Sequence, residues 1–82
     1  MTVIYNKRTG RIKLILSGDT NHVATVFGDE GVDYKKIFAE IIIPDDEYVI
    51  KHPKEFEVNP ETKELEILST TINQYKLKGE RL

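Results

Sequence analysis

The chain has 82 residues, a formal net charge of −2 and no cysteine. A chain of this length forms one domain with a single modest core, and without cysteine it has neither disulfides nor thiolate metal sites. Its 39% hydrophobic and 32% charged residues exclude a disordered chain, and no apolar run is long enough to cross a bilayer. The composition fits a reducing, cytoplasmic setting.

Charge is unevenly distributed along the chain. The first 16 residues carry only basic charged side chains, residues 17–68 carry thirteen acidic and five basic ones, and the segment from residue 69 is again mostly basic. A solvated mixed surface is one explanation of this division. The alternative is that the basic ends contact the acidic middle, within one chain or between subunits.

Two β-rich runs, residues 2–5 and 11–16, flank the turn sequence NKRTG. Asn6 at the first turn position and Gly10 at the last are typical of a type I turn followed by a left-handed residue. This turn returns the second strand antiparallel to the first. The sequence therefore predicts a hairpin over residues 2–16.

The return strand of this hairpin alternates charged and apolar side chains. The pattern predicts a wet, solvent-exposed face that carries Arg11 and Lys13. The apolar residues between and after them form a dry, buried face. Ile15 falls on the wet face, so we expect another part of the chain to cover it there.

Turn-forming residues then separate two further elements. β-branched residues predict a strand at 22–27. The apolar spacing from Tyr34 to Ile41 predicts a short helix near 33–38, with Asp33 as its cap, although a strand remains an alternative there.

The densest apolar run is KIFAEIIIP, residues 36–44. Its three consecutive isoleucines, 41–43, favour a buried strand near 40–43, which Pro44 ends. We expect this strand to be the element around which the others pack.

The last third of the chain predicts a helical turn, a hairpin and a tail. The acidic residues 45–47 start the helical turn, and His52 before Pro53 stops it. The hairpin spans residues 56–68 around NPETK, in which Pro60 presets the backbone of the second turn position. The tail, residues 71–82, is expected to be extended and flexible.

The two hairpins share one sequence pattern: an apolar residue, Asn, two variable residues, Thr, one variable residue, and then alternating charged and apolar residues. The return-strand charges are opposite, with basic residues in the first hairpin and acidic ones in the second. A common turn type explains the similarity. Alternatively, the two return strands lie side by side or meet across a dimer interface, where opposite charges attract. The predicted interaction surface comprises Lys7, Arg8, Arg11, Lys13, Glu61, Glu64 and Glu66.

No pattern in the sequence has the spacing of a reactive site. His22 and His52 are the residues that a general base or a zinc site would use, but neither has a ligand-like partner nearby. The acidic clusters near residues 29–33 and 45–47 lack the spacing of a calcium loop. We therefore predict no catalytic residue, no cofactor and no metal, and a protein that is not an enzyme.

The order of segments IYNKRTGRI, a GD turn, IPDDEYVI, HPKEFEVN and ETKELEIL resembles small uncharacterised proteins encoded in tail-module neighbourhoods of phages and prophages of Gram-positive bacteria. The likeness spans most of the chain. It implies a non-catalytic accessory or structural role in a virion or in its assembly, in the cytoplasm of the producing cell or in the virion itself. It supplies no site residues.

From these observations we expect an α+β, mostly antiparallel domain that acts as a structural or protein-interaction subunit, with a protein partner or a homo-oligomer and without a membrane. The alternative is a small nucleic-acid-binding accessory protein that uses the basic hairpin at residues 2–16. The acidic pI of about 5.6 argues against that alternative.

Overall fold

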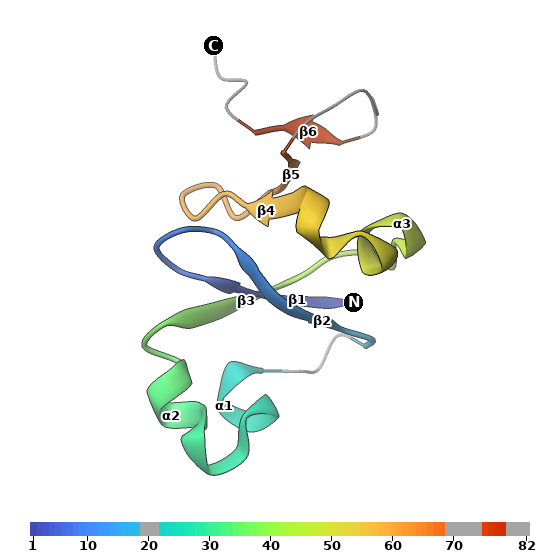
Figure 1. Ribbon diagram of the computed structural model, residues 1–82. Helices are drawn as coiled ribbons and strands as arrows, with labels where there is room; N and C mark the ends of the chain where they lie inside the picture. Colours follow the sequence, from blue (N-terminus) through green and yellow to red (C-terminus); the bar gives the residue numbers. More distant parts are fainter. Residues whose placement is uncertain (19–21, 69–74, 79–82) are drawn as a thin grey trace.

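The computed structural model describes residues 1–18, 22–68 and 75–78. It confirms a small α+β domain with two three-stranded sheets, mostly antiparallel, and a few short helices. The elements are stacked along one long direction, and the extents are 40 × 24 × 17 Å. Short helices lie at one end, the first sheet lies in the middle, and the second sheet with α3 lies at the other end (Figure 1).

The central strand of the first sheet is the first strand of the chain. The strand order is β2-β1-β3, with β1 (Thr2–Asn6) antiparallel to both β2 (Ile12–Leu16) and β3 (Phe38–Ile42). Residues 1–5 are at most 4% exposed, because neighbouring strands pair with both edges of β1 and other layers cover both of its faces. A strand buried on both faces is continuously apolar instead of alternating.

The expectation that the isoleucine triplet is buried and central is wrong. The strand exists, but β3 is an edge strand of the sheet. Ile41 and Ile43 are half-buried against the core, whereas Ile42 points to the opposite face and is 47% exposed. Three consecutive strand residues cannot all face one core, because side chains alternate between the two faces.

A β-bulge at Lys13 changes which side chains of β2 point toward the core. Ile4 pairs with Leu14 but the next residue, Tyr5, pairs with Ile12, which leaves Lys13 as the extra residue. Ile12 and Ile15 therefore pack against the same core. Ile15 is covered, as expected, but it is covered by the core and does not lie on the face of Arg11 and Lys13, because the alternation pattern assumes a regular strand.

The predicted strand at 22–27 is instead the helical turn α1 (Val23–Val26), which is followed by the 3-10 turn η1 (Gly28–Glu30). The backbone N–H of Val23 donates to a Glu40 carboxylate oxygen of β3, 3.0 Å away. Val23 is 1% exposed. A contact from a residue 17 positions later thus starts the helical turn, and it overrides the local β preference.

The predicted helix near 33–38 is shorter and begins earlier, as α2 (Gly31–Tyr34). Its N-cap is Glu30, and the predicted cap Asp33 lies inside the helix. After Tyr34 the backbone bonds tighten to three-residue spacing, and the chain enters β3. The backbones of α1 and α2 lie in close contact at Gly31. A Cβ atom at this position would lie only 2.1 Å from the Ala24 carbonyl oxygen.

The far end of the molecule begins with the predicted helical turn, α3 (Glu47–Lys51), which is confirmed. The 3-10 turn η2 (Pro53–Glu55) leads into the second hairpin, β4 (Phe56–Val58) and β5 (Leu65–Ile67), as predicted. β6 (Lys76–Leu77) adds a parallel strand beside β5. The other residues of the predicted tail, 71–74 and 79–82, lie outside the described residues.

The main core fills the space between the two sheets. Val3 and Tyr5 of β1 meet Val49 of α3 and residues of β4 and β5. The opposite face of the first sheet contacts the helical layer, where the rings of Phe27, Tyr34 and Phe38 stack with centroids 4.3–6.2 Å apart. The first sheet is therefore a middle layer with two apolar faces.

Candidate protein-binding cleft

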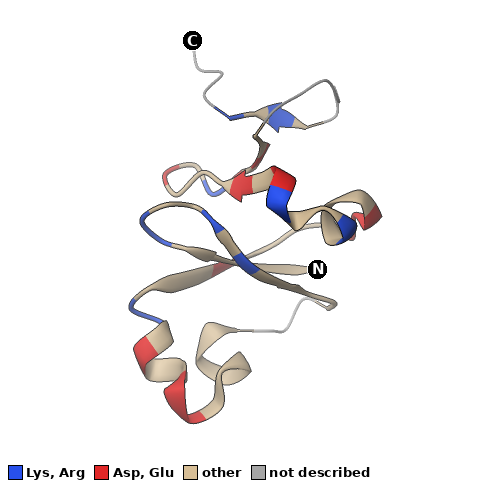
Figure 2. Ribbon diagram, viewed as in Figure 1, with Lys and Arg blue, Asp and Glu red and all other residues tan. Residues whose placement is uncertain are grey.

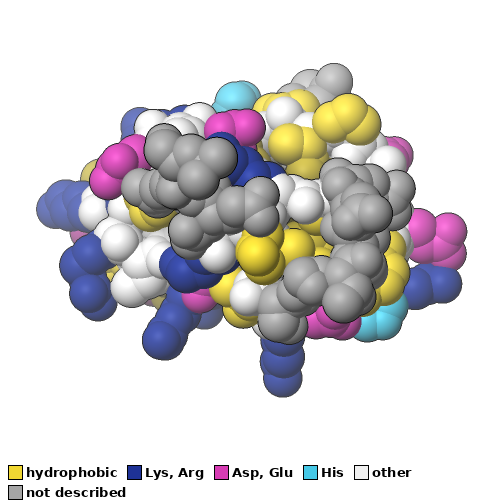
Figure 3. Space-filling model, turned by 90° about the horizontal axis from the view of Figure 1, so that it is seen from above, with side chains coloured by type: hydrophobic (Ala, Val, Ile, Leu, Met, Phe, Trp, Pro, Cys, Tyr) yellow, Lys and Arg dark blue, Asp and Glu magenta, His cyan; other side chains and the backbone are white. Residues whose placement is uncertain are grey.

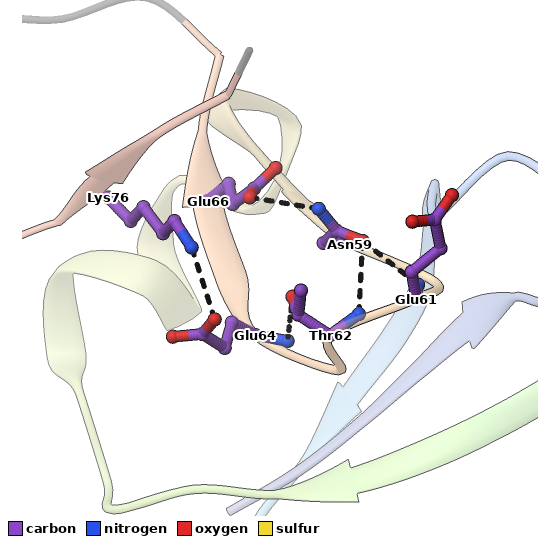
Figure 4. Close-up of polar contacts among 6 residues, drawn as sticks. All are labelled: Asn59, Glu61, Thr62, Glu64, Glu66 and Lys76. Carbon is purple, nitrogen blue, oxygen red and sulfur yellow. Dashed lines mark hydrogen bonds and ion pairs between the residues drawn. The ribbon is translucent and has the colours of Figure 1, made fainter. Parts of the chain in front are cut away.

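The two hairpin turns have the same hydrogen bonds, which confirms that their turn chemistry is shared. The Asn6 Oδ1 atom accepts from the backbone N–H groups of the second and third residues that follow it, and Asn59 Oδ1 does the same in the second turn (Figure 4). Gly10 donates to the Asn6 carbonyl as Lys63 donates to the Asn59 carbonyl, each at 2.8 Å. Gly10 and Lys63 both have positive φ, at 81° and 65°.

The end of the first turn docks onto the second hairpin and joins the two sheets. The Val58 N–H donates to the Gly10 carbonyl oxygen at 2.8 Å, and Arg11 bridges Glu57 in antiparallel register. A side chain at position 10 would place its Cβ 2.1 Å from the Val58 oxygen. The absence of a side chain at Gly10 is therefore what lets the two backbones meet. The return strand β2 consequently contacts β4, and the structure does not place β2 beside β5.

Beyond this junction β2 and β4 diverge, and a cleft of about 600 Å³ opens between them. One wall is Arg11 with residues 12–15 of β2, and the other wall comes from α3, η2 and the second hairpin. The second wall consists of Ile50, Pro53, Lys54, Phe56, Glu57 and Leu68. The four successive β2 residues 12–15 all line the cleft, which is typical of a strand edge, because side chains of both faces flank it.

The hydrogen-bonding directions confirm that β2 has an open edge. The Asn6 N–H donates to the Arg11 carbonyl, so Asn6 faces β2. Directions alternate along a strand in an antiparallel ladder, so Val3 faces β3. Ile15 lies opposite Val3. The Ile15 N–H and C=O groups therefore point away from β1, toward the cleft.

The second wall of the cleft exposes apolar side chains. Ile50 on α3 is 47% exposed and Leu68 after β5 is 38% exposed. Phe56 lies beneath them, fully buried, and is held by ring contacts to Tyr48 and Tyr75. The cleft thus combines a hydrogen-bonding backbone edge with an apolar wall.

The net charge of the cleft lining is positive. Arg11, Lys13 and Lys54 line it with one acid, Glu57, whose carboxylate is paired with Lys78 at 2.8 Å. No described residue forms an ion pair with any of the three lining cations, and the Lys13 ammonium lies 5.8 Å from the Phe38 ring centroid. Figure 2 shows basic residues along the first turn and β2, opposite one acidic position of β4.

The structure separates the residues of the predicted interaction surface. Glu64 is paired with Lys76 at 3.1 Å, and Glu66 is 3% exposed, with one oxygen 3.2 Å from the Asn59 amide nitrogen (Figure 4). A buried carboxylate cannot take part in an exposed surface, so Glu66 is excluded from it. The three remaining turn residues, Lys7, Arg8 and Glu61, are exposed at the turn tips, and Arg11 and Lys13 lie at the cleft.

Of the eleven residues that line the cleft, the predicted interaction surface includes only Arg11 and Lys13. The whole second wall was missed, because its residues come from α3, η2, β4 and the position after β5, and no local pattern brings them together. An exposed apolar residue on the short helical turn, Ile50, was the available signal.

The two histidines lie in different layers. His22 precedes α1, and its Nδ1 atom is 3.6 Å from a Glu40 oxygen. His52 ends α3, and its Nδ1 atom is 2.9 Å from the Tyr48 carbonyl oxygen. Among residues 1–18, 22–68 and 75–78, no cluster of three or more His, Cys, Asp or Glu could hold a metal ion. None of the helices within these ranges has the length and apolar composition needed to span a membrane.

Figure 3 looks down on the end of the molecule that carries β6. Basic and acidic side chains are interspersed around the rim of this view. A mixed surface of this kind differs from the continuous basic face that nucleic-acid binding favours.

Comparisons with family models, with curated proteins and with solved structures found no match to this chain.

Proposed function

We propose that this protein is a non-catalytic interaction module that binds an extended segment of a partner polypeptide at the free edge of β2. The observation that carries the proposal is the open edge at Ile15 beside an apolar wall. An added strand would satisfy the backbone groups of the edge and bury its own side chains against Ile50 and Leu68.

The structure of the cleft supports an extended ligand over a compact one. A volume of about 600 Å³ with one strand edge as a wall suits a few residues of extended chain. Main-chain hydrogen bonds supply affinity in this binding mode, and the apolar wall selects every second side chain of the ligand.

A titration of ¹⁵N-labelled protein with a pool of capped heptapeptides tests the proposal. The peptides carry Val or Ile at alternate positions and Glu, Gln or Lys at the others. We expect shifts of the β2 amide signals and slower hydrogen exchange at Ile15. A matched pool with proline at two consecutive central positions loses an edge-facing N–H group in either register and should leave these signals unchanged.

Matched variants locate the binding. Ile50→Gln removes an exposed apolar side chain of the cleft, and Ile37→Gln removes one of similar exposure, 50%, outside it. We expect the first change to weaken peptide binding several-fold and the second to leave it unchanged. Binding that perturbs β3 and not β2, or that ignores Ile50→Gln, contradicts the proposal.

The role in a virion or its assembly stays a prediction that rests on the resemblance of the sequence. It is compatible with a strand-binding module, because structural assemblies often join subunits by strand addition.

A further inference from the structure

We infer that the segment bound at β2 is an acidic strand of a partner protein, with acidic and apolar side chains in alternation. This inference rests on the proposed function and adds the chemistry of the partner.

The charges at the cleft carry the first step. Arg11, Lys13 and Lys54 line the cleft without an ion-pair partner among the described residues, whereas the lining acid Glu57 is already paired with Lys78. The first turn adds two exposed cations near the start of β2. An acidic ligand therefore gains attraction along the edge, and a basic ligand meets repulsion.

The geometry of strand addition predicts the alternation. One face of an added strand would meet the apolar wall at Ile50 and Leu68. The other face would lie on the side of the sheet where the Lys13 ammonium stands over the Phe38 ring. Because successive side chains point to opposite faces, apolar residues on the first face leave the acidic residues for the second.

The same charges disfavour a second copy of this chain as the occupant. Residues 1–16 contain four basic residues and no acidic residue. Pairing of two β2 edges in any register would bring two basic strands within the distance of neighbouring strands, about 4.8 Å. Basic residues on edge strands are a common protection against such self-association.

Three matched capped heptapeptides test the inference: EVEIEVE, QVQIQVQ and KVKIKVK, titrated at low and at moderate salt. We expect all bound peptides to slow hydrogen exchange at Ile15. The acidic peptide should bind roughly tenfold tighter than the neutral one at low salt, because each partly exposed ion pair changes affinity by up to about fivefold. Added salt should reduce this difference.

Charge reversal supplies the control. Arg11→Glu with Lys13→Glu reverses the two lining cations of the β2 wall, of which Lys13 stands on the face assigned to the acidic side chains, and it should invert the order of the acidic and basic peptides. Lys35→Glu with Lys36→Glu makes the same change of net charge in the exposed turn after α2 and should preserve the order. Dispersed amide signals of each free variant confirm that it is folded.

The outcomes separate the two proposals. Equal affinity of the three peptides, with protection at Ile15, overturns the acidic preference and leaves strand addition intact. No effect of any peptide on β2 overturns both. Protection of Ile15 without peptide in a concentration-dependent dimer assigns the edge to a second copy, and displacement of the acidic peptide by a single-stranded oligonucleotide assigns it to nucleic acid; either result overturns the inference.

Discussion

Two residues with the same backbone conformation show how a single position connects local structure to packing. Gly10 and Lys63 occupy equivalent places in the two turns, and both have positive φ. Gly10 lies against the Val58 carbonyl, whereas Lys63 is exposed. The requirement for glycine there comes from packing as well as from φ.

Gly10→Ala should therefore be much more destabilising than Gly28→Ala. Gly28 also has positive φ, 59°, but a Cβ there meets nothing within 4 Å. We expect a loss of about 1 kcal/mol for Gly28→Ala and about 3 kcal/mol for Gly10→Ala, because the second must also displace the junction between the sheets. Urea unfolding of both variants measures the free energies. Equal losses would show that the contact at Val58 contributes nothing.

Lys63→Gly should stabilise the protein. Lys63 is an exposed non-glycine residue with a φ of 65°. Removing its side chain relieves the left-handed strain, for which we expect a gain of up to about 1 kcal/mol in the free energy of unfolding. Thermal unfolding measures the gain, and Lys54→Gly, at an ordinary φ, is the control that should not show it.

At the level of elements, the sequence predicted what local chemistry determines. Both hairpins were predictable because Asn, Thr and the left-handed residue encode their turns, and α3 was predictable from its acidic start and from Pro53. Elements that depend on distant contacts were not predictable. The turn at α1 depends on Glu40, and the open cleft depends on the bulge at Lys13 and the junction at Gly10.

Asp46 is the cap of α3, whereas Asp33, the predicted cap of the preceding helix, lies inside α2. Asp46 caps α3, with one oxygen 3.0 Å and 3.3 Å from the backbone nitrogens of Tyr48 and Val49, and it also accepts from the Tyr75 hydroxyl. Asp46→Ala should lower the free energy of unfolding by about 2 kcal/mol, since it removes the cap and leaves the hydroxyl without its acceptor. Asp33→Ala, inside α2, should change it by less than about 0.5 kcal/mol. Similar losses for both variants in chemical denaturation would contradict this assignment.

At the scale of the whole molecule, Tyr75 connects the last described strand to α3. Burial, then the hydrogen bond to Asp46 and its negative charge, raises the pKa of Tyr75 from 10.0 to about 12. A raised pKa in the folded state means that folding favours the protonated hydroxyl. Its stabilisation is complete below pH 10 and is lost as the pH rises toward about 12.

The Tyr75→Phe variant should have a lower free energy of unfolding than the unsubstituted protein below pH 10. This difference should become smaller as the pH rises toward about 12. Denaturant unfolding at several alkaline pH values measures this difference, and ultraviolet titration of the variant should lack the phenolate step near pH 12 that Tyr75 contributes. Tyr34→Phe, in the helical layer, is the matched control. Tyr48, whose pKa is also raised, first by its hydrogen bond to Glu55, should keep its own step in the Tyr75 variant. A difference in the free energy of unfolding that stays constant with pH would contradict this contribution of the Tyr75 hydroxyl.

The central place of β1 in its sheet has a consequence for the order of events on the ribosome. The first hairpin can close as soon as residue 16 has emerged, but the other edge of β1 must wait for β3, which ends at Ile42. During that interval the nascent chain displays a strand that is apolar on both faces and has one unpaired edge, and such an edge adheres to other chains. Rapid elongation through residues 17–42, or a chaperone that shields β1, should therefore govern the yield of correctly folded protein in the cell.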